Sequence, residues 1–73
     1  MKNRDMFEDA LGQIREGELE SEKAAPDLEL VKNHLESSEL FLAEALEYRM
    51  VPDLSALEDL RRRQGQLRDW LHT

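Results

Sequence analysis

The chain has 73 residues, no cysteine and a formal net charge of −7. A domain of this size buries only about 60% of the surface that its unfolded chain exposes, so such scaffolds usually need disulfides, a metal or a partner subunit. The lack of cysteine excludes disulfides, thiolate zinc sites and thiol nucleophiles. A partner chain is then the expected reinforcement.

The negative charge is concentrated in the first two-thirds of the sequence. Residues 1–50 hold 6 Lys and Arg against 13 Asp and Glu, whereas residues 51–73 hold 4 against 4. A negative field repels phosphate backbones and anionic membranes, so we expect no direct nucleic-acid or membrane binding. The sequence has no apolar run of signal-peptide length or long enough to span a bilayer. These features predict a cytoplasmic protein.

The first apolar pattern predicts a helix over about residues 4–24. Its apolar side is formed by Met6, Phe7, Ala10, Leu11 and Ile14. We expect a firm helix up to residue 16 and a weaker second half, because like charges four residues apart repel each other along a helix. Two such pairs occur, Glu16 with Glu20 and Glu18 with Glu22. Packing of the small residues Gly17, Ser21 and Ala24 against another chain could stabilise this half.

The tripeptide Pro-Asp-Leu occurs twice, each time before a long apolar pattern. Proline is tolerated at the first helical position, where its missing amide hydrogen would have no partner. We therefore predict that Pro26 and Pro52 open two helices, over about residues 26–49 and 53–72. Asp27 and Asp53 would lie in the first turn, where the helix dipole favours negative charge; alternatively Asp53 is itself the cap. The stretch SALE at residues 55–58 also has capping-box spacing.

The second predicted helix has the broadest apolar face. At helical spacing, an arc of roughly 160° contains Leu28, Leu30, Val31, His34, Leu35, Phe41, Leu42, Ala45, Leu46 and Tyr48. An arc of this width predicts contact with two neighbours and therefore a central position in the fold. Leu40 is the exception, because it falls on the polar side.

The third predicted helix carries leucines at a three-four spacing. These are Leu57, Leu60, Leu67 and Leu71, with Gln64 at the remaining seam position. The short link YRMVP predicts that this helix folds back antiparallel to the central one. The sequence thus predicts one all-α domain over residues 1–73: an antiparallel helical hairpin plus an N-terminal helix. It would be either a three-helix bundle or a hairpin that dimerises into a helical bundle.

Residues able to support catalysis are few. We expect His34, at the edge of the central apolar arc, to be partly buried with a hydrogen-bond partner, and His72 to interact with a helix C-terminus. The sequence contains no Asp-x-Asp-x-Asp-Gly calcium loop, no His-Glu-x-x-His motif and no glycine-rich phosphate loop. It therefore predicts no enzyme, no cofactor or metal, and no small-molecule substrate.

The basic stretch RRRQGQLR at residues 61–68 reads mainly as a salt-bridged surface, although Arg63 lies two turns before Trp70 on one helix edge. Arginine and tryptophan are enriched at binding hot spots, while Trp70 could equally close the end of a small core. The predicted partner-binding residues are Phe41, Tyr48, Leu57, Leu60, Arg63, Leu67, Trp70 and Leu71. The expected partner is another protein or a second copy, most simply in a dimer.

Two functions follow as hypotheses. The first is a non-enzymatic helical interaction module, an adaptor or chaperone-like subunit that binds through its apolar seam. In size and hairpin layout the chain is similar to the small cochaperones of bacterial secretion needles, a likeness of architecture without a shared motif. The alternative is an acidic inhibitor that imitates a nucleic-acid backbone and blocks a basic groove. Its effective groups would be Glu16, Glu18, Glu20, Glu22, Glu36, Glu39, Glu44 and Glu47.

Overall fold

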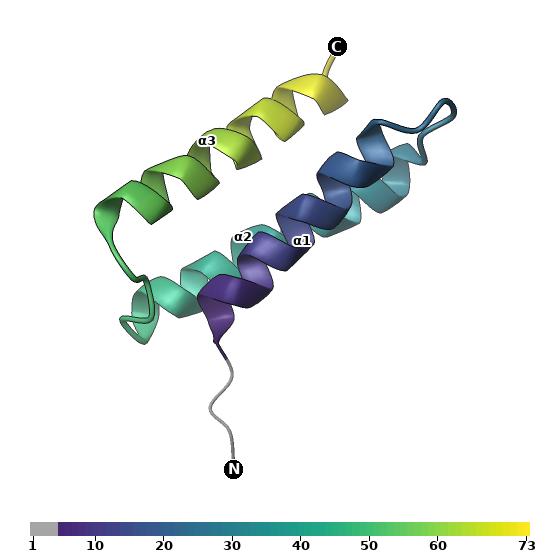
Figure 1. Ribbon diagram of the computed structural model, residues 1–73. Helices are drawn as coiled ribbons and strands as arrows, with labels where there is room; N and C mark the ends of the chain where they lie inside the picture. Colours follow the sequence, from purple (N-terminus) through teal and green to yellow (C-terminus); the bar gives the residue numbers. More distant parts are fainter. Residues whose placement is uncertain (1–4) are drawn as a thin grey trace.

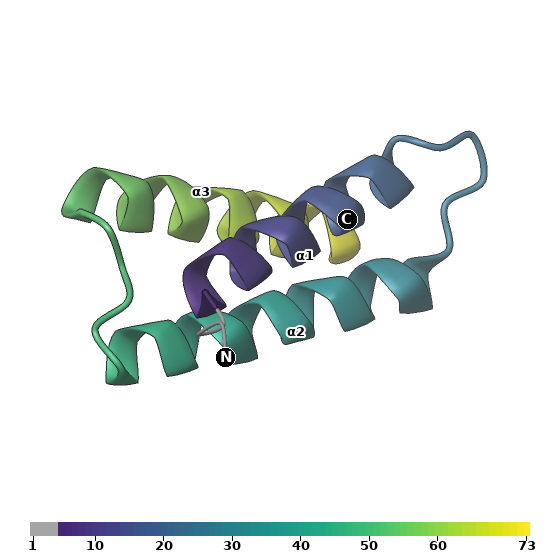
Figure 2. The same cartoon turned by 60° about the horizontal axis from the view of Figure 1, so that its bottom comes forward.

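The computed structural model describes residues 5–73, which form three helices and contain no strand. These are α1 (Met6–Ser21), α2 (Leu28–Glu47) and α3 (Leu54–Leu71). Helices that follow one another in the chain run antiparallel, and α3 lies along the other two (Figures 1 and 2). The all-α, three-helix-bundle prediction is confirmed. Residue 4, where the first helix was expected to start, lies outside the described residues, and no helix in 5–73 is long and apolar enough to cross a membrane.

Each helix begins after an aspartate whose side chain accepts backbone hydrogen bonds. Asp5 accepts from the amide of Phe7 at 3.0 Å, while Asp27 and Asp53 accept from amides three residues ahead, at 3.2 Å and 2.7 Å. These bonds satisfy donors that have no partner within the helix. The prediction that Pro26 and Pro52 occupy the first helical position was therefore wrong, because both prolines precede the cap. The alternative, with Asp53 as the cap, is the observed arrangement.

The predicted capping box at residues 55–58 is not used as a helix start. Asp53 caps α3 two residues before Ser55, so Ser55 already lies inside the first helical turn. The helix follows the first side chain that can accept the free amides in the right geometry, and the aspartate supplies a stronger, charged acceptor.

The second half of α1 is helical as far as Ser21, in spite of its repelling glutamates. Glu20 is buried and accepts a hydrogen bond from the backbone amide of Asp27 at 3.0 Å, and its other oxygen pairs with Lys23 at 2.9 Å. Glu18 pairs with Arg63 of α3. These two interactions remove one member of each like-charged pair from the solvated face, so the repulsion no longer opposes the helix.

The closest helix pair is α1 and α2, not the α2–α3 hairpin expected from the sequence. Gly17 explains the close approach. A Cβ atom at this position would lie 2.8 Å from Cδ2 of Leu67, 3.4 Å from Cβ of His34 and 3.8 Å from the carbonyl oxygen of Val31. Gly17 of the small-residue side therefore packs within the same chain, whereas Ala24 is exposed and lies beyond the end of α1, so the helix is shorter than predicted.

The core lies between the three helices and contains nine buried apolar residues: Phe7, Ala10, Ile14, Val31, Leu35, Leu42, Ala45, Leu60 and Leu67. One polar pair crosses it. Gln64 Nε2 donates to Oγ of Ser38 at 3.2 Å, and that hydroxyl donates to the carbonyl of Leu35 at 2.6 Å. Both side chains are buried, so this pair fixes the register of α3 on α2, since any shift would leave buried polar groups unsatisfied.

The buried face of α2 is narrower than the predicted arc. Leu28, Leu30, Leu46 and Tyr48 are exposed, whereas Ser38 is fully buried in the middle of the face. The helix is unbroken and contacts both neighbours, but α1 and α3 cover only the centre of the arc. Its edges therefore remain in solvent. Leu40, placed on the polar side by its spacing, is 68% exposed.

The C-terminal end of α2 forms a Schellman motif with an unusual residue. Met50 donates to the carbonyl of Ala45 at 2.7 Å and Arg49 to that of Leu46 at 3.3 Å. Arg49 has a positive φ of 56°. This left-handed conformation favours glycine, because a Cβ atom crowds the following carbonyl oxygen. The turn that leads to α3 therefore holds local backbone strain at Arg49.

We predict that the same substitution has different effects at two glycines of α1. Gly12→Ala should raise the free energy of unfolding by about 1 kcal/mol, because alanine favours helix and a Cβ atom at Gly12 meets nothing within 4 Å. Gly17→Ala should give no such gain, because Leu67 must move. Urea denaturation of both variants measures the difference, and equal gains would contradict the packing described at Gly17.

A second prediction concerns Arg49. Arg49→Gly should raise the free energy of unfolding by about 1 kcal/mol, since glycine adopts the left-handed conformation without the steric cost. Arg49→Ala should give no comparable gain, because alanine also carries a Cβ atom. Thermal denaturation of the two variants would show the contrast. A Gly variant no more stable than the Ala variant would argue against the αL turn.

Candidate functional site

Two of the eight predicted partner-binding residues belong to the core of this chain. Leu60 is 0% and Leu67 is 4% exposed. Leu67 contacts the surface of α1 at Gly17. The prediction that these two leucines face a partner was wrong, because the bundle closes over them. The three-four spacing of α3 reports which side is buried, but does not say whether the covering surface comes from the same chain.

The other apolar residues of the predicted set lie around the edge of the core. Phe41, Leu57, Trp70 and Leu71 are partly buried and pack against it. Tyr48 is 63% exposed at the C-terminal cap of α2. The structure does not bring the eight residues together into one surface, since they are spread over the core, its edges and the α2–α3 turn.

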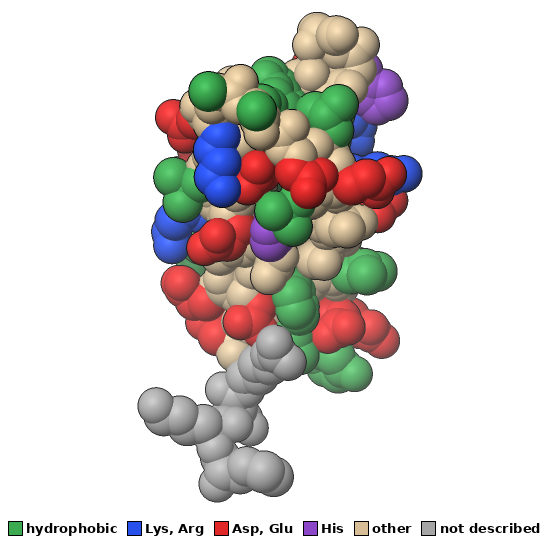
Figure 3. Space-filling view, turned by 90° about the vertical axis from the view of Figure 1, so that its right-hand side faces the viewer, with side chains coloured by type: hydrophobic (Ala, Val, Ile, Leu, Met, Phe, Trp, Pro, Cys, Tyr) green, Lys and Arg blue, Asp and Glu red, His purple; other side chains and the backbone are tan. Residues whose placement is uncertain are grey.

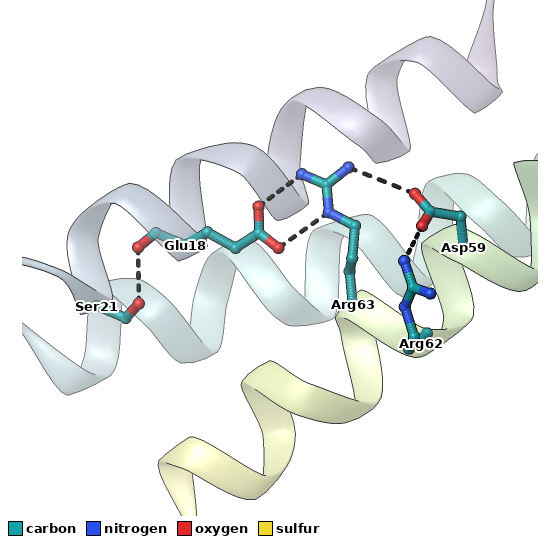
Figure 4. A network of polar contacts seen from close by, with 5 residues as sticks. All are labelled: Glu18, Ser21, Asp59, Arg62 and Arg63. Carbon is teal, nitrogen blue, oxygen red and sulfur yellow. Dashed lines mark hydrogen bonds and ion pairs between the residues drawn. The ribbon is translucent and has the colours of Figure 1, made fainter.

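Arg63 joins α3 to α1 through a two-pronged ion pair. Its Nε donates to one oxygen of Glu18 at 2.9 Å and its Nη2 donates to the other at 2.6 Å, while Asp59 lies 4.0 Å from Nη1 (Figure 4). The hydrogen bonds to Glu18 raise the pKa of Arg63 above its ordinary value. Arg63 is thus engaged inside the chain, where it holds the edge of the bundle together.

Trp70 lies beside this ion pair. It borders a shallow hollow of about 160 Å³ together with Glu18, Arg63 and Gln66. The indole packs partly against the core, as expected if Trp70 closes one end of it. The volume of this hollow is smaller than that of a typical ligand pocket, which is about 300–1,000 Å³.

A larger groove runs between α2 and α3, with a volume of about 400 Å³. Its apolar lining comes from Leu28 and Leu35 of α2 and Leu71 of α3. The polar lining residues are Glu29, Lys32, Glu36, Glu39, Arg68 and His72. An ion pair between Glu39 and Arg68 connects the two sides. Apolar side chains in the floor with charges at the rim are the arrangement that lines a helix-docking groove.

The groove could have been found in part from the sequence. Leu28, Leu35 and Leu42 are seven residues apart, which places them on one side of α2. The same side carries Leu46, which is 40% exposed. Leu71 was the single member of the predicted binding set that lines the groove, and the two α2 leucines were missed as binding residues because they were assigned to the buried seam.

His34 and Glu20 both have partners within the chain. Nδ1 of His34 lies 2.8 Å from Oε1 of Gln13, so the partly buried imidazole has the partner expected for it. Within residues 5–73, no three His, Asp or Glu side chains gather closely enough to hold a metal ion. Glu20 is fully engaged, because the ammonium of Lys23 and the amide of Asp27 hold the pKa of its carboxyl below the ordinary value.

Comparisons with protein-family models, with curated proteins and with solved structures give no match for this chain.

The engagement of Glu20 predicts a specific acid sensitivity. Because folding lowers its pKa, the carboxylate stabilises the fold above its ordinary value of 4.5, and this contribution is lost as the pH falls through the lowered pKa. Glu20→Gln should therefore flatten the decline in unfolding free energy over that range. Lys23→Gln should flatten it in part. Chemical denaturation at several pH values measures both slopes, and two curves parallel to wild type would refute the assignment.

Proposed function

We propose that the protein is a non-enzymatic interaction module that binds a helix of a protein partner in the groove between α2 and α3. The groove itself carries the proposal. Three leucines line it, two of its walls are helices, and a helix laid between them would complete a four-helix arrangement. The chain is small, so even a modest gain in buried apolar surface would add to its stability.

The exposed apolar side chains support a docking role. Leu28 is 57% exposed at the start of α2, beside the groove that it lines. Leu71 of α3 lies in the same lining and is partly buried. Scattered exposed leucines are ordinary, but leucines that border one groove provide a site for an amphipathic helix.

The alternative, an acidic imitation of a nucleic-acid backbone, has less support. Glu18, Glu20 and Glu39 are three of its eight effective groups, and all three are paired within the chain. On the face shown in Figure 3, carboxylates are interrupted by apolar and basic side chains and form no continuous block. A protein that imitates a nucleic-acid backbone needs a row of unpaired negative charges, so these ion pairs argue against this function.

Site-specific photo-crosslinking tests the proposal. A photoreactive amino acid at Leu28 should cross-link to a protein, because Leu28 borders the groove. The matched control is Leu19, which is 55% exposed on the outside of α1, away from the groove. It should give no product. Products of equal yield from both positions, or none from position 28, would overturn the proposed site.

A further inference from the structure

The two walls of the α2–α3 groove carry opposite charges. On the α2 side, Glu29, Glu36 and Glu39 outnumber the single cation Lys32. On the α3 side the charged lining residue is Arg68, accompanied by His72. Arg61 is exposed one heptad before Arg68 and so lies on the same side of α3. The α2 wall is thus acidic and the α3 wall carries the cations, although Arg68 already pairs with Glu39 of its own chain. Because a guanidinium has five N–H donors, Arg68 can bond Glu39 and also a carboxylate of a second copy, which allows the surface to complement itself.

We propose that the groove is filled by a second copy of this chain, related by a two-fold axis parallel to the helices. In this dimer α2 of each copy packs against α3 of the other, and four helices share one apolar centre. The inference rests on the proposed function, because it names the partner of the same groove.

Charge complementarity selects this axis. A two-fold rotation about a line parallel to the helices lays α2 over α3 and keeps each residue at its own height along the bundle. A rotation about a line across the helices lays α2 over α2, so that acidic wall meets acidic wall. Like charges in contact cost free energy, whereas opposite walls attract and orient the approaching copies.

The register within one copy shows which residues would meet. Ser38 bonds to Gln64, and Glu39 pairs with Arg68, so residues 36–39 of α2 are level with residues 64–68 of α3. Because the parallel axis preserves height, Glu36 of one copy would lie opposite Arg68 of the other. The symmetry repeats this pair, which gives two Glu36–Arg68 contacts per dimer.

The available surface is sufficient for a weak dimer. A helix of 20 residues such as α2 is about 30 Å long, and two adjacent helices are roughly 20 Å wide. The face therefore covers on the order of 600 Å² per copy, at the low end of specific interfaces. Interfaces of this size include weak and transient complexes, so we expect the monomer and the dimer both to be observable in solution.

Sedimentation velocity over a range of protein concentrations tests the proposal. The wild type should shift from monomer to dimer as concentration rises. Leu28→Glu should weaken this dimer at least tenfold, because it places a carboxylate in the apolar floor. Leu19→Glu, a matched change at a residue of similar exposure outside the groove, should leave association unchanged. Wild type that stays monomeric, or equal effects of the two substitutions, would overturn the proposed dimer.

A charge exchange tests the symmetry. Glu36→Lys and Arg68→Glu should each sediment as monomer, because each homodimer would contain two repulsive contacts. An equimolar mixture should dimerise again, since both contacts then join opposite charges. Far-UV circular dichroism verifies that each variant is folded, and the comparison of Leu28→Glu with Leu19→Glu tests the dimer if Arg68→Glu is not folded. A mixture that stays monomeric while wild type dimerises would overturn the parallel axis.

The two proposals can fail separately. If the purified chain is monomeric throughout while position 28 cross-links to a different protein, the second copy is excluded and the groove remains a binding site. If position 28 gives no product and the chain is monomeric, the groove has no protein partner and both proposals fall.

Discussion

The bundle depends on the absence of a side chain at Gly17. Val31 and His34 of α2 approach this position from one side and Leu67 of α3 from the other, so all three helices meet there. A protein of 73 residues has little apolar surface to bury, and close packing makes that surface more effective because dispersion contacts are lost quickly with separation. The helices α1 and α2 can therefore form a tight pair in a chain that has no disulfide to join them.

Polar interactions then decide how α3 is placed on that pair. Arg63 reaches Glu18 of α1, and Gln64 reaches Ser38 of α2, one side chain toward each neighbour. A buried hydrogen bond adds little net stability, but a wrong register would leave its groups unsatisfied, which is costly. These contacts hold α3 along one side of α2 and leave the groove that contains Leu28, Leu35 and Leu71. The packing that completes the monomer core thus also creates the surface proposed for binding.

The helices and much of the core could be predicted from apolar spacing, since Val31, Leu35, Leu42, Leu60 and Leu67 all lie on their predicted buried sides. Which two helices pack most closely could not be predicted. The close packing of α1 on α2 depends on Gly17, because this residue has no Cβ atom to hold the helices apart. The role of Glu20 could not be predicted either. The sequence predicts a repelling pair with Glu16, whereas the Glu20 carboxylate accepts a hydrogen bond from the backbone amide of Asp27, a contact that helical spacing does not reveal. The groove depends on how far α3 stands from α2, and this distance follows from side-chain contacts between the helices.

The most direct test of this account is a nuclear Overhauser experiment on the protein in solution. The packing predicts cross-peaks from the α protons of Gly17 to the methyl groups of Leu67 and to the β protons of His34, which arise from three different helices. If both sets of cross-peaks are present, the three helices converge at this glycine. If Gly17 shows contacts to His34 but none to Leu67, then α3 does not close on the α1–α2 pair, and the core and the groove described above are both incorrect.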